Sequence, residues 1–202
     1  MEKKLIEETL EIDGHVLNRI IALRDFGEVK KGDLGGFIEK ESNLAHYWNC
    51  WIYNDAVVYG DAVVYGDAKV YDNAKVYGDA KVYGNAEVYG NAKVCGNAEV
   101  YGNATVCGNA EVCSIAEVCG NAEVYGDAKV CGNAIVEKKS SYIVFKNWWS
   151  SGRYFTWTRS NDMWSVGCFY GTGEELIKKA YKDSEEKGRE YARIVKYVKS
   201  IK

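Results

Sequence analysis

The chain has 202 residues and a formal net charge of −3, which is enough length for one or two domains with a buried core. It contains no apolar run near the roughly 18 residues that a membrane span needs, and no N-terminal apolar segment typical of a secretory signal. These features predict a cytoplasmic protein without membrane contact.

The first predicted element is a β-hairpin. The runs Thr9 to Ile12 and His15 to Ile21 flank Asp13-Gly14, a pair that favours a type I′ turn. A glycine-rich segment from Gly32 to Ile38 follows, but it lacks the Lys-Ser/Thr pair and the strand-to-helix context of a phosphate-binding loop. We therefore interpret it as a turn into the next element and assign residues 1–35 to a hairpin cap.

A six-residue repeat occupies the middle of the chain. Every sixth residue from Ala56 to Ala134 is Ala, and every sixth residue from Val58 to Val136 is Val, without exception. The unit is A-x-V-[Y/C]-G-[N/D] at nearly every repeat. Ala and Val point to one side of an extended segment, and Gly followed by Asn or Asp tolerates positive φ. Each unit is therefore a short strand that ends at a corner.

The period of six constrains how these strands assemble. It is too short for a hairpin meander or a βαβ unit, so three units closing one 18-residue coil is the simple solution. Val then fills the interior, Ala fits the tight corners, and each strand pairs with its equivalent one coil away, at about 4.8 Å. Continuing the register backwards puts Ile38, Leu44, Cys50 and Ile52 at core positions, with His46 as a misfit. We assign residues 36–140 to this β-helix.

The pattern of an aliphatic residue followed four positions later by a small one, as in Val70 and Ala74, resembles the hexapeptide-repeat left-handed β-helix family. The resemblance implies a left-handed coil and a homo-oligomer, with a trimer favoured. The segment from Asp33 to Ile38 leading into the repeats is similar to uncharacterised bacterial and phage-encoded hexapeptide proteins, many of them labelled acyltransferases from the repeat alone. The expected fold class is mainly β: a left-handed parallel β-helix with an N-terminal β-hairpin cap and a small C-terminal α+β domain.

The 18-residue coil also predicts three outward columns of Tyr and Cys side chains. They are Tyr59, Tyr77, Cys95, Cys113 and Cys131; Tyr53, Tyr71, Tyr89, Cys107 and Tyr125; and Tyr65, Tyr83, Tyr101 and Cys119. The first column is the favoured contact between subunits, because small side chains admit close approach. Its cysteines lie within disulfide range, but we expect thiols in a reducing cytosol. At one corner, Ser114-Ile115 replaces Gly-Asn and predicts a packing contact with the C-terminal region.

Residues 141–202 are predicted to form the small α+β domain. Three antiparallel strands are expected at Tyr142 to Phe145, Tyr154 to Thr158 and Met163 to Phe169. The sequence from Thr172 to Glu175 is a capping box that opens a helix, and a second helix is expected from Ser184 to Ser200.

The same region has a composition suited to an anionic, nucleotide-like small molecule. Residues 142–202 hold 12 Lys and Arg against 7 Asp and Glu. Most of the aromatic residues are needed for the core of so small a domain, but the remainder can stack on a base while arginines bind phosphate. The candidate ligand-binding residues are Trp148, Trp149, Arg153, Tyr154, Trp157, Arg159 and Trp164.

These features favour a non-catalytic ligand-binding or sequestering protein that uses the β-helix as an oligomerisation scaffold. A phage-encoded chain of this kind would counteract host defence by capturing a nucleotide-derived signal. The alternatives are an acyl-CoA-dependent acyltransferase with His46 as the candidate base, and a structural or protein-interaction module. We assign no catalytic residue, no cofactor and no metal site, since no ligand spacing matches one. Nucleic-acid binding is disfavoured because the basic residues after Glu174 alternate with acidic ones.

Overall fold

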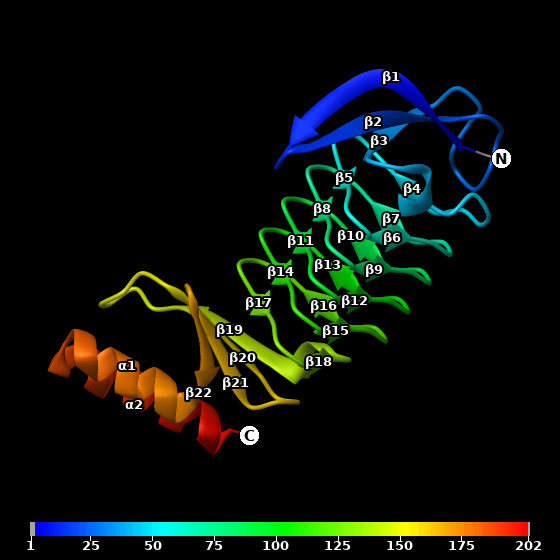
Figure 1. The fold of residues 1–202 in the computed structure, drawn as a ribbon. Helices are drawn as coiled ribbons and strands as arrows, with labels where there is room; N and C mark the ends of the chain where they lie inside the picture. Colours follow the sequence, from blue (N-terminus) through cyan, green and yellow to red (C-terminus); the bar gives the residue numbers. More distant parts are fainter. Residues whose placement is uncertain (1–2, 202) are drawn as a thin grey trace.

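The computed structural model describes residues 3–201 as an elongated β-helix with a β-hairpin at one end and an α+β unit at the other (Figure 1). The hairpin consists of β1 (Lys3–Ile12) and β2 (His15–Ala22), which pair in antiparallel fashion. Asp13 and Gly14 have φ values of 52° and 83°, as a type I′ turn requires, so the predicted hairpin is confirmed.

The hairpin continues into the β-helix through β3 (Leu34–Ile38). This strand pairs with β2 on one side and, in parallel, with β5 on the other. A Cβ atom at Gly36 would collide with the carbonyl oxygen of Ala56, so the first coil can approach this closely only because the residue is glycine. The glycine-rich segment is therefore an entry into the β-helix, as predicted.

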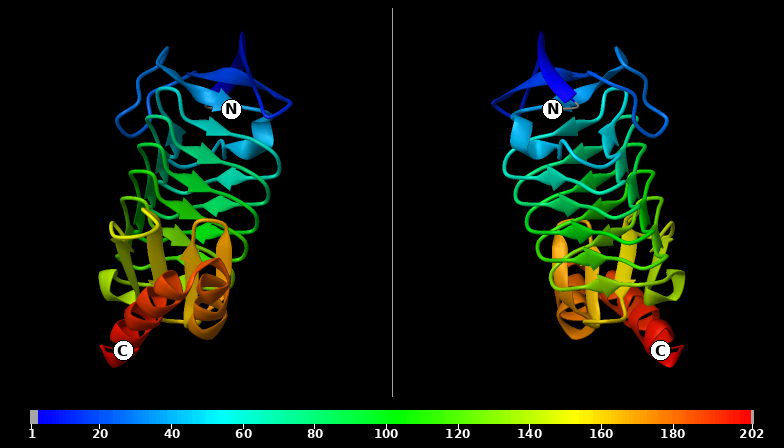
Figure 2. Two further views of the ribbon diagram at one scale, coloured as in Figure 1. Left: turned by 90° about the vertical axis from the view of Figure 1, so that its left-hand side faces the viewer. Right: turned by 90° about the vertical axis from the view of Figure 1, so that its right-hand side faces the viewer.

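Three parallel sheets form the faces of the β-helix, and Figure 2 shows their rungs stacked along one axis. Face A contains β5 (Val57–Val58), β8 (Lys75–Val76), β11 (Lys93–Val94), β14 (Glu111–Val112) and β17 (Lys129–Val130). Face B contains β4 (Trp51–Ile52), β7 (Lys69–Val70), β10 (Glu87–Val88), β13 (Thr105–Val106) and β16 (Glu123–Val124). Face C contains β6 (Val63–Val64), β9 (Lys81–Val82), β12 (Glu99–Val100), β15 (Glu117–Val118) and β18 (Ile135–Val136).

The register of these sheets is 18 residues, because Val88 pairs with Val70 on one side and Val106 on the other. The repeat Val side chains are 0% exposed and the repeat Ala side chains at most 1%. The degenerate positions Ile38, Leu44, Cys50 and Ile52 are buried in the same core. The predicted fold class, a left-handed parallel β-helix with a hairpin cap and a small α+β domain, is confirmed.

The C-terminal unit contains a four-stranded antiparallel sheet of β19 (Tyr142–Lys146), β20 (Tyr154–Thr158), β21 (Met163–Val166) and β22 (Phe169–Thr172). The prediction of one strand from Met163 to Phe169 is wrong, because Gly167 takes a φ of 58° and turns the chain into a hairpin. Two helices follow, α1 (Gly173–Asp183) and α2 (Glu185–Ser200). The capping box is confirmed, since the Thr172 side chain accepts from the Glu175 backbone N–H and Glu175 accepts from that of Thr172.

The sheet of the C-terminal unit lies between the β-helix and the two helices (Figure 1). The Tyr142 ring packs on the β-helix core, and its hydroxyl donates to the Glu123 carbonyl at 3.0 Å. The Lys129 backbone N–H donates to Thr156 Oγ1 at 2.9 Å. These contacts cover the last coil. Ile115 does not join them, because its side chain is 61% exposed, so its predicted packing contact is wrong.

Short 3₁₀ helices at Glu41–Asn43 and Lys139–Ser141 mark the two ends of the β-helix. Among residues 3–201, no helix is both long and apolar enough to cross a membrane.

Candidate functional site

The loop between β19 and β20, residues 147–153, stands beside α2 and is shaped by the buried side chain of Asn147. The Asn147 Oδ1 accepts the backbone N–H of Trp149 at 3.0 Å and that of Ser150 at 3.5 Å. The Asn147 backbone N–H donates to the Arg153 carbonyl at 2.9 Å, which closes the loop. Because Asn147 is 0% exposed and both its side-chain oxygen and its side-chain nitrogen are hydrogen-bonded within the loop, it fixes a loop whose Trp148 and Trp149 side chains are exposed.

A groove of about 420 Å³ lies between this loop and α2, and we call it the loop–helix groove. One wall carries the rings of Phe145 and Trp149, and the Trp149 side chain is 85% exposed. The other wall carries Arg189 and Arg193, which are four residues apart on α2 and therefore share one helix face. The groove thus combines exposed aromatic surface with two guanidinium groups.

The charges of the loop–helix groove are only partly paired. Arg189 lies 3.9 Å from Glu185, and the Ser150 hydroxyl donates to Glu190. Neither Arg193 nor Glu186 has a hydrogen bond or ion pair within residues 3–201. A free guanidinium can bind an anionic oxygen, and a free carboxylate can accept from an amino group. The groove therefore offers both kinds of polar contact beside an aromatic ring.

A second groove, of about 250 Å³, lies where β20 and β21 meet face A, and we call it the strand groove. It is lined by Arg153 and Tyr154 and by an ion pair in which Lys129 Nζ is 3.0 Å from Glu111 Oε1. A hydrogen bond to Asp127 is the main cause of the raised pKa of Tyr154. Its surface is more polar than that of the loop–helix groove.

The structure separates the sequence-predicted ligand residues into several groups. Trp149 lines the loop–helix groove, and Trp148 is 74% exposed nearby with Lys146 Nζ 4.0 Å from its ring centroid. Arg153 and Tyr154 line the strand groove, whereas Arg159 is exposed and lines neither groove.

Trp157 and Trp164 lie opposite each other on β20 and β21 in the core of the C-terminal unit, each 1% exposed. The Trp157 indole donates to Asp162 at 2.8 Å. Both rings are packed beneath the two helices, so in this structure neither is available to stack on a ligand.

Arg189 and Arg193 are functional candidates that the sequence reading missed. In the sequence, the basic residues after Glu174 alternate with acidic ones, and this alternation gives the two arginines no prominence. Their spacing of four residues puts the two arginines on one helix face. The apolar positions Tyr191, Val195 and Val198 lie on the opposite, buried face of the helix, and this helical pattern could have indicated the two arginines as an exposed pair.

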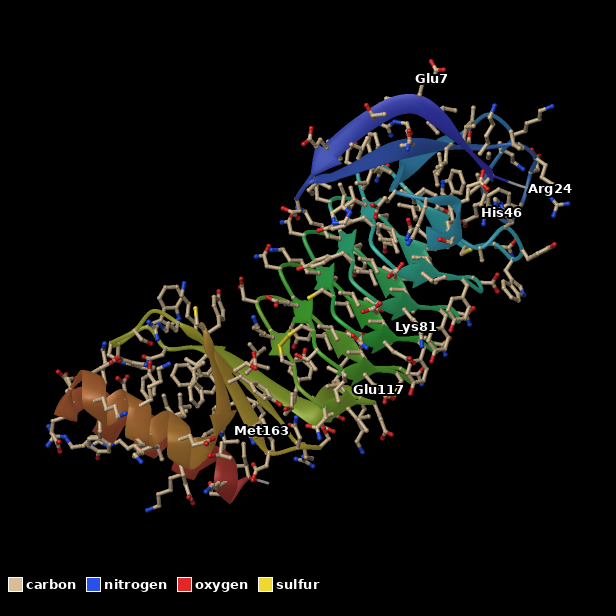
Figure 3. The ribbon with its side chains drawn as sticks, viewed as in Figure 1. Glu7, Arg24, His46, Lys81, Glu117 and Met163 are labelled. Atoms are coloured by element: carbon tan, nitrogen blue, oxygen red, sulfur yellow. A yellow bond between two sulfur atoms is a disulfide. The ribbon has the colours of Figure 1, made fainter. Side chains whose placement is uncertain are left out.

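The two histidines have different surroundings. His46 is half-buried beside a cavity of about 10 Å³, and its Nδ1 is buried without a hydrogen-bond partner in the described part of the chain (Figure 3). His15 Nδ1 lies 2.9 Å from Glu39 Oε1, and Glu39 Oε2 accepts from the Gly60 backbone N–H at 2.7 Å. The hydrogen bond to His15 is the main reason that the pKa of Glu39 is lowered. His15 is therefore the histidine with an orienting carboxylate.

The first cysteine column also departs from expectation. Cys113 and Cys131 form a disulfide, visible as a yellow bond in Figure 3, so the expectation that these cysteines remain thiols is wrong. The cause is the register of face A, which puts their Cα atoms on adjacent rungs 4.8 Å apart.

Comparison with known proteins gives a partial likeness. No protein-family model matches the chain. A protein of Escherichia coli strain K12 named as an uncharacterized acetyltransferase, YdcK, is 44% identical to it over 43 residues. That segment is 21% of this chain and only 13% of the length of the relative.

Proposed function

We propose that this protein is a non-catalytic binder of an anionic, nucleotide-like small molecule, which it holds in the loop–helix groove. The observation that carries the proposal is the placement of the exposed Trp149 ring opposite Arg189 and Arg193 in one groove. A base can stack on the indole while the guanidinium groups bind phosphate oxygens through paired N–H donors.

The acidic residues of the groove narrow the proposed ligand. Glu186 and Glu190 come from the same helix face as the two arginines. A carboxylate repels phosphate but accepts hydrogen bonds from an exocyclic amino group. Bases that carry an amino group, such as adenine, guanine or cytosine, are therefore favoured over uracil and thymine.

The β-helix enters this proposal as a scaffold. A rigid prism that assembles into a trimer would hold three C-terminal units in fixed geometry and so raise the number of binding grooves per particle. In its most specific form, the proposal is that a phage-encoded chain sequesters a nucleotide-derived signal in the host cytoplasm. The three stacked parallel sheets of the β-helix support the scaffold role, and titration with a panel of nucleotides identifies the ligand.

Thermal-shift and calorimetric titration with a panel of mono-, di- and cyclic nucleotides would test the binding. At least one member with an amino-bearing base should raise the melting temperature, and Trp149→Ala or Arg193→Gln should weaken its binding at least about tenfold. Arg159→Gln is the matched control, since this exposed arginine lines neither groove. A panel without any shift, or equal losses in Arg159→Gln and Arg193→Gln, contradicts the proposal.

An acyl-CoA-dependent acyltransferase is the second candidate, and the His15–Glu39 pair favours it. Hydrogen bonding through Nδ1 leaves Nε2 of His15 free to act as a general base, and Glu39 would stabilise the imidazolium that forms. The named acetyltransferase relative points the same way. This candidate predicts acetyl-CoA turnover that is lost in His15→Asn and retained in His46→Asn. If the protein neither binds a nucleotide nor turns over acetyl-CoA, the remaining candidate is a structural or protein-interaction module.

A further inference from the structure

Glu111, Cys113 and Cys131 meet on the outer surface of face A. Glu111 and Cys113 are two residues apart along one rung, so both side chains point outward, and Cys131 lies directly over Cys113 on the next rung. One carboxylate oxygen and the two sulfur atoms all lie within 4.8 Å of one another. Two potential thiolates and a carboxylate are thus gathered by the register alone.

We propose that these three residues form a site for Zn²⁺ or a similar thiophilic divalent cation, and that the Cys113–Cys131 disulfide is the closed, metal-free state of the site. Zinc prefers thiolate and carboxylate ligands, with Zn–S bonds of about 2.3 Å and Zn–O bonds of about 2.0–2.2 Å. Two sulfurs bound to one tetrahedral zinc lie roughly 3.8 Å apart at that bond length. Rungs with Cα atoms 4.8 Å apart can reach this separation by side-chain rotation.

The surroundings of Glu111 are compatible with this role. Its Oε1 lies 3.0 Å from Lys129 Nζ, so Oε2 is the oxygen that remains to bind a metal ion. Lys129 also offsets part of the negative charge that two thiolates and a carboxylate bring together. Because Glu111 also lines the strand groove, water or a further ligand can reach the proposed site from that groove.

The disulfide controls the proposed site because a disulfide sulfur is a poor metal ligand. A dithiol reductant transfers two electrons and two protons to the Cys113–Cys131 bond, yielding two thiols and one oxidised dithiol. Binding of the cation then releases the two thiol protons, since the thiolate is the ligand form. The site therefore opens on reduction, and it closes when a disulfide oxidant takes up two electrons and two protons from the two thiols and is itself reduced to a dithiol.

Sequence motifs could not reveal this cluster. Metal-binding cysteines are usually recognised by pairs two to four residues apart, whereas Cys113 and Cys131 are separated by 18 residues, one full coil. Only the closure of the coil converts that separation into direct contact.

Titration of the full-length protein with Co²⁺, followed by its thiolate-to-cobalt charge-transfer absorption, tests the site. The protein is reduced with a dithiol, desalted without oxygen and titrated beside an oxidised sample. The expected result is one Co²⁺ per chain in the reduced sample, displaced by Zn²⁺, and none in the oxidised sample.

Variants then assign the ligands. Cys113→Ser and Cys131→Ser should each abolish the charge-transfer band, and Glu111→Gln should weaken binding at least about tenfold. Cys168→Ser is the control, because Cys168 is an exposed free cysteine in the β21–β22 turn. Circular dichroism of each variant checks that the β-helix is folded. The proposal is overturned if reduced protein binds no Co²⁺, or if folded Cys113→Ser or Cys131→Ser protein binds it as tightly as Cys168→Ser.

Discussion

The Lys3 Nζ lies 3.3 Å from the Cys50 Sγ, and the two residues are 2% and 0% exposed. The same amine donates to the carbonyl oxygens of Ala45 and Cys50, each at 2.7 Å. Burial is the main cause of both the lowered pKa of Lys3 and the raised pKa of Cys50. A lysine of the first strand thus satisfies backbone acceptors at the open end of the first coil, which has no preceding rung to pair with.

Substitution of Lys3 should destabilise this end of the β-helix. In Lys3→Met the two buried carbonyl groups lose their donor, so the free energy of unfolding should fall by about 1–3 kcal/mol. Lys4→Met is the matched control, since Lys4 is exposed on the same strand. Urea unfolding of both variants measures the difference, and equal stability would refute a structural role for the buried amine.

The free energy of unfolding should decline in alkaline solution because several tyrosines have a higher pKa in the folded state than in the unfolded chain. Burial is the main cause of the raised pKa of Tyr142, which reaches about 12, and the pKa values of Tyr71 and Tyr83 are raised as well. Unfolded tyrosines ionise near pH 10. Above that pH the folded state binds more protons, so the free energy of unfolding falls as pH rises toward the folded pKa values.

The urea midpoint measured from pH 8 to pH 12 checks this expectation. It should be flat below about pH 10 and fall above it. Tyr142→Phe should reduce the slope of the fall, whereas Tyr197→Phe, which removes a tyrosine that is 64% exposed, should leave it unchanged. A urea midpoint that does not change with pH up to about pH 12 would contradict the prediction that the raised tyrosine pKa values contribute to stability.

The glycine corners should differ in their tolerance of alanine. Gly84 and Gly126 have φ values of 71° and 67°, so a Cβ strains the backbone at both, by about 1–2 kcal/mol. At Gly84 the added Cβ would also lie 3.0 Å from the Gly102 backbone nitrogen, whereas at Gly126 nothing lies within 4 Å. Gly84→Ala should therefore lower the melting temperature more than Gly126→Ala, and the reverse order would contradict close rung packing at the corner.

The proposed trimer can be tested by mass. Native mass spectrometry and sedimentation at micromolar concentration should report three times the chain mass of 22.6 kDa. At one end of face A, Val57 packs in one cluster with Leu17 of the hairpin, and at the other end Lys129 is bonded to the C-terminal sheet. An added charge on the open middle of face A should therefore weaken assembly. Cys95→Glu places that charge, and Cys107→Glu on face B is the control. If the unaltered protein has the mass of a monomer, the proposed trimer is wrong.

The sequence by itself determined the β-helix, because nearly every six-residue unit repeats the same pattern of inward Val, small Ala and a glycine corner. Each six-residue unit specifies a short strand with Val inward and a glycine corner, and a slip of one residue would turn Val outward, so the strands stack with Val over Val. The core, the outward columns and the hairpin before them follow from residues close together in the chain. The same logic located the capping box, since its two hydrogen bonds join Thr172 and Glu175 across three residues.

The tertiary structure alone decided what lies in each candidate site. Strand β20 is covered on both faces, by the helices over Trp157 and by the β-helix end over Thr156, so alternation could not tell an inward ring from an exposed one. Trp149 and Arg193 line one groove only because the loop between β19 and β20 stands beside α2. Contacts between distant segments depend on how whole elements dock, and no local pattern encodes that docking.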